Sequence, residues 1–441
     1  MRTTVSNWNH YPVKDTELTY WRGESITDRT ESWIARGMGR CYGDASLSDH
    51  IFSTLKHNHI LDFDSETGVV CCQSGVTLQG LLEVFVPKGW FLPVTPGTKF
   101  ITVGGALASD IHGKNHHVAG CFGDHVTNCT LILPNGERVS CSPTENQEIF
   151  SATRGGMGLT GMIDTVTFNL KKIESSYIRQ RQVKAKNLGE ILELFDTYKS
   201  HTYSMAWIDC LKGGNNFGRS IMMMGEHATL DELTEKQRKN PLSSQLSPKI
   251  NMPINLPGFV LNSFSIKAFN LLYYNKNTRK VIENTVHYDP FFYPLDSILN
   301  WNRMYGKNGF VQYQFVLPLN NSEAGLRKIM NQIRQRGWGS FLTVLKLFGK
   351  QDSLISFPME GYTLALDFPM RRGLFTFLDE LDQLVLELGG RIYLSKDARM
   401  KPETFQKGYP NSQEFLSILK KINPNLSVQS DLAKRLSILA S

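Results

Sequence analysis

Residues 93–117 constrain the fold and the chemistry of this chain more than any other stretch. They read PVTPGTKFITVGGALASDIHGKNHH. The Pro-Gly pair at 96–97 predicts a turn, and the β-branched residues 101–103 predict a short strand that ends at a pair of glycines. Glycines let backbone N–H groups approach a ligand closely, and the polar residues 110–117 supply donors and proton carriers. The stretch therefore predicts a loop that holds a ligand beside groups that can act on it.

Two other interpretations of this stretch are open. A tight turn followed by a solvated polar loop would have the same composition. The three histidines His112, His116 and His117 could instead ligate a metal. Their spacing is not that of a zinc site, and no cysteine or carboxylate pair completes one nearby, so we predict no metal.

Length and charge narrow the class of protein. A chain of 441 residues is too long for one ordinary core, so two domains are expected. The net charge of +7 suits an anionic ligand or an acidic membrane surface. No block of lysines and arginines suggests a nucleic-acid-binding tail, so no nucleic-acid partner is expected.

Cysteine usage and the N-terminus bear on the compartment. The seven cysteines include no CxxC pair, and the first residues contain no apolar core of a signal peptide. No uninterrupted apolar run is long enough to cross a bilayer. Reduced thiols in a cytoplasmic protein are the simplest account.

A second glycine-rich segment, residues 36–44, follows a short strand predicted at 32–35. It reads RGMGRCYGD, with three glycines and two flanking arginines. Backbone N–H groups in such a loop bind phosphate oxygens, and arginine compensates their charge. Taken alone, the segment could also be a glycine-rich β-turn.

Residues 156–161 match the pattern GxGxxG literally, but they do not predict a Rossmann nucleotide site. That fingerprint needs a strand before it and a helix after it. Here a helix is predicted before it, at 144–152, and an alternating strand after it, at 163–168. The loop could still contact a nucleotide through its backbone.

The remaining elements fall into two groups that differ in character. The first half of the chain predicts strands at 60–63 and 69–73, a helix at 78–86 capped by Thr77, and a hairpin at 130–141 with an Asn-Gly turn. From residue 172 onward, strands alternate with helices and predict a sheet with helices on one face. The strands are predicted at 204–208, 310–316, 341–346 and 362–368, and the helices at 188–198, 323–336 and 374–388.

Residues 236–274 form an unusual pair of segments. The first, 236–256, is rich in Pro, Ser, Asn and Lys and predicts a mobile loop. The second, 259–274, is apolar and aromatic and predicts a buried core helix. An apolar lid or a contact with a membrane surface is the alternative for the second segment.

Several motifs, in order and over nearly the whole chain, carry a resemblance to a known family. Besides the two glycine loops and residues 155–163, they are FVQYQFVLP, LKLFG, SFPMEGYTLALDFP and GRIYLSKDAR. Together they resemble the vanillyl-alcohol-oxidase-type FAD flavoproteins and, within them, the branch that oxidises decaprenylphosphoryl-β-D-ribose. DIHGKNHH and YLSKDAR are specific to that branch, whereas the glycine loops indicate only the wider superfamily.

The resemblance implies an α+β, two-domain fold that binds FAD. Residues 1–171 would form the N-terminal part of the FAD-binding domain. Residues 172–375 would form an inserted substrate domain of sheet and helices, and residues 376–441 would return to the FAD region. The flavin pyrophosphate would lie on the glycine loops, and the adenine end would lie near Ile163.

Site residues follow from the same resemblance, position by position. Cofactor contacts are implied for Arg36, Gly37, Met38, Gly39, Arg40, Cys41, Tyr42, Gly43, Gly97, Thr102, Val103, Gly104, Gly105, Ser109, His112, Ile163 and Tyr393. Substrate contacts are implied for Lys114, Tyr305, Gln312, Gln314, Lys346 and Asp367. Gln312 and Gln314 also share one face of their predicted strand, where two amides suit a hydroxyl-rich ligand.

Lys396 and His112 are the predicted catalytic residues. Burial beside another cation would lower the pKa of Lys396 and let it accept the proton of the reacting hydroxyl. His112 could be the base instead, because imidazole titrates near neutrality. Lys114 and Lys346 could hold a phosphate or hydroxyls of the substrate.

Two departures from the family pattern matter. Many superfamily members link FAD covalently to a histidine in the first glycine loop, where this chain has Arg40, so non-covalent FAD is expected. In mycobacterial members a cysteine stands where this chain has Ala365. That change alters the pocket wall and leaves the redox chemistry untouched.

The resulting functional hypothesis is oxidation of the 2-hydroxyl of a polyprenyl-phosphoryl ribose to the 2-keto sugar. A separate short-chain reductase would complete the epimerisation to arabinose for cell-envelope glycans. The protein would be cytoplasmic, with a peripheral contact at the inner face of the plasma membrane. A soluble aldose, alditol or aldonolactone oxidase is the alternative, and a non-catalytic FAD-fold protein that binds glycolipid is a third.

Overall fold

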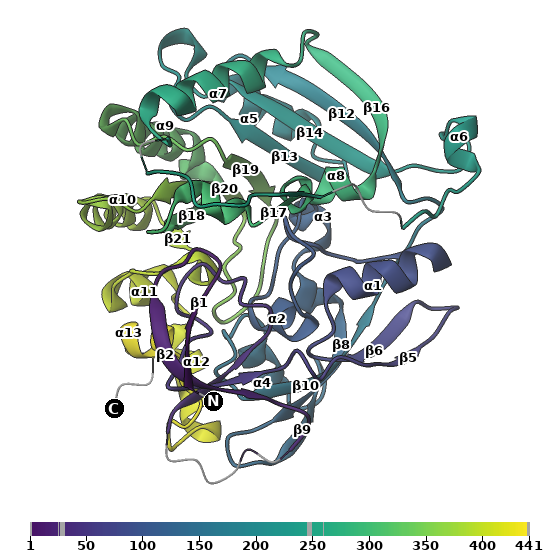
Figure 1. Ribbon diagram of the computed structural model, residues 1–441, viewed down its shortest axis with the longest axis vertical. Helices are drawn as coiled ribbons and strands as arrows, with labels where there is room; N and C mark the ends of the chain where they lie inside the picture. The colour runs from purple at the N-terminus through teal and green to yellow at the C-terminus, as the bar shows by residue number, and fades with distance from the viewer. Residues whose placement is uncertain (1, 25, 27–30, 245–248, 259, 439–441) are drawn as a thin grey trace.

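Figure 1 shows the computed structural model of the chain, which describes residues 2–24, 26, 31–244, 249–258 and 260–438. The two ends of the chain share the lower lobe, and the middle of the chain forms the upper lobe. Each lobe combines sheets with helices, which confirms the predicted α+β class.

The lower lobe is built on two sheets. Its five-stranded sheet is antiparallel throughout and has the order β5 (Ile60–Phe63), β6 (Val69–Gln73), β10 (Met162–Asn169), β8 (Val126–Ile132) and β9 (Arg138–Cys141). Its four-stranded sheet has the order β1 (Arg2–Ser6), β2 (Val13–Tyr20), β4 (His50–Ser53) and β3 (Trp33–Arg36). The β8–β9 hairpin turns at Gly136, whose φ of 85° is the left-handed conformation that an Asn-Gly turn requires.

Short helices cover these sheets, and the C-terminal segment packs with them. They are α1 (Leu78–Phe85), α2 (Val103–Ala108), α3 (His116–Ala119), α4 (Gln147–Thr153), α11 (Pro402–Gly408), α12 (Ser412–Ile422) and α13 (Asp431–Arg435). Val428 forms a parallel bridge with Trp33, and Arg435 donates a hydrogen bond to Asp44 at 2.7 Å. Residues more than 380 positions apart are therefore joined in one lobe.

The strand predicted at residues 101–103 is wrong. Thr102 is the N-cap of α2, and its hydroxyl accepts a hydrogen bond from the backbone N–H of Gly105 at 3.2 Å. A threonine that caps a helix gains this bond, and the gain outweighs the strand propensity of a β-branched run only three residues long. The predicted helix beginning after Thr77 is confirmed as α1, with Thr77 as its cap.

The upper lobe is one eight-stranded antiparallel sheet. Its order is β16 (Val281–His287), β12 (Tyr177–Ala185), β14 (Ser220–His227), β13 (Tyr203–Ile208), β19 (Thr343–Phe348), β20 (Gly361–Pro369), β18 (Phe310–Pro318) and β21 (Arg391–Ile392). Three helices pack on one face, as predicted: α5 (Leu188–Thr197), α9 (Leu319–Arg336) and α10 (Leu374–Glu387). Because β21 belongs to this sheet and α10 contacts it, the sheet-and-helix layer continues to Ile392, beyond the boundary predicted at 375.

Smaller elements connect the lobes and flank the sheet. They are β7 (Trp90–Phe91) paired with β11 (Lys171–Lys172), β15 (Ile250–Asn251) paired with β17 (Ile298–Leu299), and the helices α6 (Glu235–Arg238), α7 (Ser263–Asn275) and α8 (Tyr288–Phe292). Within the segment predicted as a loop at 236–256, residues 245–248 lie outside the described residues.

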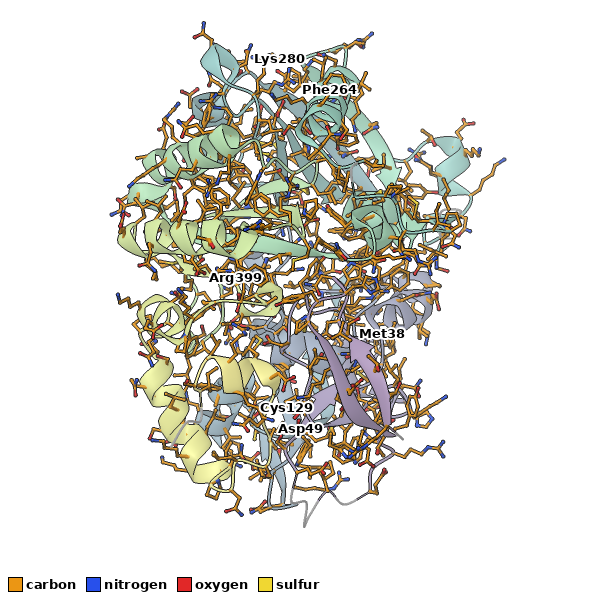
Figure 2. All side chains as sticks on the ribbon, turned by 60° about the vertical axis from the view of Figure 1, so that its left-hand side comes forward. Met38, Asp49, Cys129, Phe264, Lys280 and Arg399 are labelled. Atoms are coloured by element: carbon orange, nitrogen blue, oxygen red, sulfur yellow. The ribbon has the colours of Figure 1, made fainter. Side chains whose placement is uncertain are left out.

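Helix α7 leaves most of its large apolar residues exposed, so the core-helix interpretation is wrong. Phe264 is 82% exposed and Leu272 is 72% exposed, whereas Ile266 and Asn270 are buried. Figure 2 shows Phe264 at the end of the molecule opposite to Cys129 and Asp49 of the lower lobe. The apolar side chains point in several directions around the helix, and a polar residue anchors it to the sheet. Within the described part of the chain, no helix has the length and apolarity to cross a bilayer.

Candidate active site

A cavity of about 750 Å³ lies between the two lobes. The glycine loops and residues 93–117 of the lower lobe form one side, and the sheet of the upper lobe forms the other. Most of the predicted site residues line it together: Arg36, Gly37, Met38, Gly39, Arg40, Cys41, Tyr42, Gly97, Thr102, Gly104, Gly105, Ser109, His112, Lys114, Ile163, Gln312, Gln314, Lys346, Asp367, Tyr393 and Lys396.

Three predicted site residues are not in the lining, and each supports it from behind. Val103 is fully buried in the hydrophobic core of the lower lobe. Gly43 lies so close to the C-terminal segment that an added Cβ would come within 1.7 Å of the Asp397 carbonyl oxygen. The Tyr305 hydroxyl donates a hydrogen bond to Asp367 Oδ2 at 3.0 Å, which places this ring behind the carboxylate.

The first glycine loop presents unused hydrogen-bond donors to the cavity. Among the described residues, the backbone N–H groups of Met38, Gly39, Arg40 and Cys41 have no hydrogen-bond partner. The Arg36 guanidinium crosses behind Gly39, where a Cβ would clash with it at 2.2 Å, and is held by the carbonyl of Ser6 at 2.8 Å. Consecutive free N–H groups beside a fixed guanidinium make an anion-binding cradle. The loop therefore fits the pyrophosphate of a dinucleotide such as FAD.

In the second glycine segment, the glycines allow the backbone to pack closely against its neighbours, but their N–H groups are already hydrogen-bonded. The Gly104 N–H donates to the Ser74 carbonyl at 2.8 Å, and the Gly105 N–H is taken by Thr102. A Cβ on Gly104 would lie 2.7 Å from that of Ser74, so only glycine fits. The Ser74 hydroxyl lines the cavity, is buried and has no partner among the described residues. It is a donor for a ligand that sequence reasoning missed, because no motif marks it.

Lys396 lies beside the first glycine loop, in a short 3₁₀ helix (Leu394–Lys396) that follows β21. Its ammonium group lies over the ring of Tyr42, 3.6 Å from the centroid. In the described residues it makes no hydrogen bond or ion pair. Burial, together with the charge of Lys346, lowers the pKa of Lys396 to about 7, although Asp367 opposes the shift. An amine of this pKa can accept a proton near neutral pH.

Asp367 is the carboxylate that faces Lys396. Its two oxygens accept hydrogen bonds from the Gln312 side chain at 2.6 Å and from Tyr305, so its orientation is fixed. Burial raises the pKa of Asp367 to about 6, against these bonds and against Lys396, which lower it. The carboxylate is therefore mostly ionised at neutral pH and can orient a hydroxyl or an ammonium group.

A relay of hydrogen bonds fixes the tautomer of His112. The Thr363 hydroxyl donates to the Phe315 carbonyl at 2.8 Å, so it can only accept from the amide nitrogen of Gln314 at 3.2 Å. The same nitrogen lies 3.2 Å from His112 Nε2 and donates to it. A neutral imidazole that accepts at Nε2 carries its proton on Nδ1.

The other ring nitrogen of His112 is available to a ligand. Nδ1 is buried and has no partner among the described residues. Burial, with Lys346, His116 and Lys396, holds the pKa of His112 well below its usual range, so the ring is neutral. His112 is thus built as an Nδ1–H donor rather than as a proton acceptor.

Two further lysines line the cavity on the substrate side. Lys114 donates to the Phe291 carbonyl at 2.8 Å, and burial lowers its pKa to about 7. Lys346 makes no hydrogen bond or ion pair in the described residues, and burial lowers its pKa to about 8. The cationic side chains in the lining outnumber its carboxylates, so the cavity favours an anionic ligand; the cations are Arg36, Arg40, Lys114, Lys276, Lys346 and Lys396, and the carboxylates are Asp296 and Asp367.

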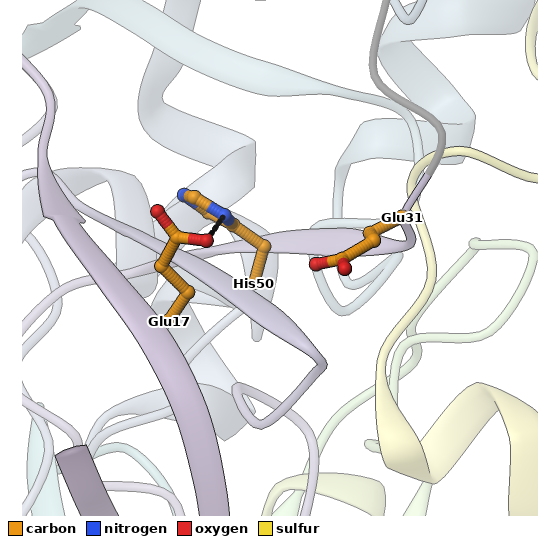
Figure 3. A group of neighbouring side chains, drawn as sticks. All are labelled: Glu17, Glu31 and His50. Carbon is orange, nitrogen blue, oxygen red and sulfur yellow. Dashed lines mark ion pairs between the residues drawn. The ribbon is translucent and has the colours of Figure 1, made fainter. Parts of the chain in front are cut away.

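One group of metal-ligand residue types occurs in the described residues, far from this cavity. Ligand atoms of Glu17, Glu31 and His50 lie within 4.8 Å of one another (Figure 3). His50 pairs with Glu17 at 3.6 Å, and the Glu17 side chain is 46% exposed. None of the three lines the cavity, and an exposed acidic pair of this kind is no evidence of a metal site.

The fold and the cavity define a class of protein. Residues 25–142 match the family model described as an FAD binding domain, and they contain both glycine segments. With the free N–H groups of the first loop, the neutral Nδ1–H of His112 and the lysine of low pKa, the chain is an FAD-dependent oxidoreductase.

Similar proteins identify the family within this class. The chain is 38% identical over 414 residues to the decaprenylphosphoryl-β-D-ribose oxidase of Mycolicibacterium smegmatis, which covers 92% of this chain and 89% of that protein. It is 30% identical to an uncharacterised protein of Streptomyces coelicolor over 82% of this chain and all of that protein. The L-gulonolactone oxidase of Bos taurus is 28% identical over 39% of each chain. This chain belongs to the decaprenylphosphoryl-ribose oxidase family.

Proposed function

We propose that this enzyme oxidises the 2-hydroxyl of a polyprenyl-phosphoryl ribose to the 2-keto sugar. The groups that line the cavity together carry this proposal: an anion cradle, Lys396 with Asp367, and the unpaired Lys346. The activity named for the relative that covers most of the chain agrees with it. The 2-keto product needs a second hydride donor to become the arabinose epimer, so a separate short-chain reductase would act next.

Lys396 is the proposed base. When bound, FAD supplies the acceptor for the hydride that leaves the sugar carbon. The neutral amine of Lys396 takes the hydroxyl proton and becomes an ammonium group, which Asp367 stabilises. Asp367 itself is held in place by Gln312 and Tyr305, so the pair is oriented before substrate arrives.

His112 and Lys346 have binding roles in this proposal. The Nδ1–H of His112 donates to an oxygen of the cofactor or of the sugar, because the relay through Gln314 leaves it no other role. Lys346 has no protein partner and sits on the sheet beside the sugar position, so it holds the substrate phosphate. The cofactor contacts implied for the other lining residues remain part of the proposal.

A contact with the membrane would bring this enzyme to its lipid. Helix α7 exposes Phe264, Leu271 and Leu272. Figure 2 shows Phe264 at the end of the molecule remote from the FAD-binding lobe. Apolar side chains on an exposed helix insert into the headgroup boundary of a bilayer. We place the enzyme in the cytoplasm, with this end at the inner face of the plasma membrane.

The test is anaerobic mixing of the purified yellow protein with farnesyl-phosphoryl-β-D-ribose. Bleaching of the flavin is expected, and reduction of the product with borodeuteride should place deuterium at C2 of the sugar. A soluble alditol and an aldonolactone serve as comparison substrates. Bleaching by these instead would favour the soluble oxidase alternative, and no bleaching by any of them would favour a non-catalytic glycolipid-binding protein.

A further inference from the structure

The cavity continues beyond the sugar position into an apolar lane. Its floor is the sheet face of β13, β14 and β19, which presents Met205, Trp207, Met223 and Val344. Its roof is helix α7, which presents Phe269 and Tyr273. Neither the cofactor cradle nor the proposed base lies in this part of the cavity.

The lining changes character in step with the strand order. On β18 and β20 the cavity face is polar, with the two glutamines and Asp367. On the next strand, β19, the cavity face carries Lys346 and then Val344. On β13 and β14 it consists of methionine and tryptophan side chains. Moving across the sheet, a ligand therefore meets hydroxyl-binding groups, then the unpaired cation of Lys346, then an apolar surface that ends at Gln180 and Gln182 of β12.

Polar anchors hold α7 above the sheet and leave the lane open. The Asn270 side chain donates to Asp209 at 2.8 Å at the end of β13, and the Asn277 side chain donates to Gln182 at 2.9 Å on β12. Between these anchors Tyr273 packs against Trp207, with ring centroids 4.8 Å apart. The Trp207 indole is itself fixed by the Phe341 carbonyl at 3.0 Å.

We propose that this lane, between α7 and strands β13, β14 and β19, binds the isoprenoid tail of the substrate. This inference rests on the proposed function. Such a lipid has a sugar at one end, then a phosphate, then the tail. The cavity offers matching groups in the same order: the polar face of β18 and β20, then Lys346, then the apolar lane. Flexible methionines and flat aromatic rings suit a chain of repeating branched alkene units, which offers no hydrogen-bonding group.

Two variants test the lane against a matched control. Met223→Gln conserves volume on the floor, and Phe269→Gln removes an aromatic ring from the roof. Lys267→Gln is the control, because Lys267 is exposed on the same helix and does not line the cavity. The probes are farnesyl- and decaprenyl-phosphoryl ribose in a neutral detergent, beside a methyl-phosphoryl ribose that has no tail.

In both lane variants, KM for decaprenyl-phosphoryl ribose should rise about ten-fold or more, because a polar group then faces the apolar tail. Turnover of the methyl probe and FAD content should stay at the parent values, and the control should match the parent with every probe. If KM changed by the same factor for all three probes in both lane variants, the proposal that the lane binds the tail would be refuted. If the parent itself bleaches with none of the probes, the proposed function fails instead.

A second measurement uses the unmodified holoenzyme. A farnesyl-phosphoryl ribose with a diazirine near the tail end should crosslink within residues 203–208, 220–227, 263–275 or 343–348, and excess unlabelled decaprenyl probe should suppress the label. Label confined to other peptides would show that the tail lies elsewhere and would overturn the proposal even if a variant failed to fold.

Discussion

Replacing Lys396 by alanine is the sharpest perturbation of the proposed chemistry. The Lys396 ammonium group makes no hydrogen bond or ion pair among the described residues, so the substitution removes only its cation–π contact with the Tyr42 ring. The free backbone N–H groups of residues 38–41, which form the anion cradle, do not depend on the Lys396 side chain, so FAD should stay bound. Loss of a positioned acid–base group slows a reaction by about 10²-fold or more, and flavin reduction should slow by that factor.

The magnitude follows from the pKa of this lysine. With a pKa of about 7, about three quarters of the amines are neutral at about pH 7.5, against about one in a thousand at the ordinary value of 10.5. Burial thus raises the population of the free base by nearly three orders of magnitude. Because the base form increases with pH, flavin reduction in the parent should rise through about pH 7, and the alanine variant should lose this rise.

Stopped-flow absorbance of the anaerobic flavin measures the rate, and the visible spectrum measures bound FAD. Lys396→Arg should not restore activity, because arginine stays protonated at neutral pH. Lys401→Ala is the matched control, since Lys401 is 63% exposed in the same segment and is ion-paired with Asp379 outside the cavity. A rescue by arginine would make Lys396 a fixed charge, and a parent-like rate in the alanine variant would refute the assignment. Loss of FAD in that variant would place Lys396 in the cofactor site.

Acid precipitation should release the yellow colour into the supernatant, because Arg40 stands where related flavoproteins carry a linking histidine; colour in the pellet would contradict non-covalent FAD. His112→Ala should slow flavin reduction by about 10²-fold, the scale for losing a positioned donor, whereas His112→Asn, whose amide can donate from a similar place, should lose clearly less. If both variants slowed flavin reduction equally, His112 would act as a base and not as a donor. Trypsin should cut first within residues 236–256, where Lys236 and Lys249 are exposed, and long-tail substrate should slow the cut. Equal cutting rates with and without lipid would count against a lid.

Local patterns predicted the elements that surround the site better than the site itself. The Asn-Gly hairpin, the helix after Thr77 and the alternating strands of the upper lobe are set by neighbours in sequence, and all are confirmed. The strand at 101–103 failed because the hydroxyl of Thr102 serves the next turn of helix. Whether Thr102 caps a helix or extends a strand depends on a single hydrogen bond, which residue propensities do not predict.

Contacts between distant segments were beyond reach of the sequence. The unpaired hydroxyl of Ser74 can be identified as a ligand donor only once β6 and α2 are known to pack together. In that arrangement the Gly104 N–H donates to the Ser74 carbonyl, while the hydroxyl has no partner among the described residues. The tautomer of His112 depends on Thr363, a residue 251 positions away by their numbering, acting through Gln314. Alternation in residues 204–208 identified two faces of a strand, but no local signal says which of them faces a ligand.

Charge balance ties the cofactor, the substrate and the base together. Lys114, Lys346 and Lys396 all line one cavity, and Asp367 is the carboxylate that faces the last of them. Burial lowers the pKa of each lysine, and Lys346 lowers the pKa of the other two further. Anions at the cradle and beside Lys346 would relieve this repulsion, so an anionic cofactor and a phosphorylated substrate each stabilise the arrangement that the chain alone makes unfavourable. The groups that recognise phosphate therefore also tune the lysine that accepts the proton.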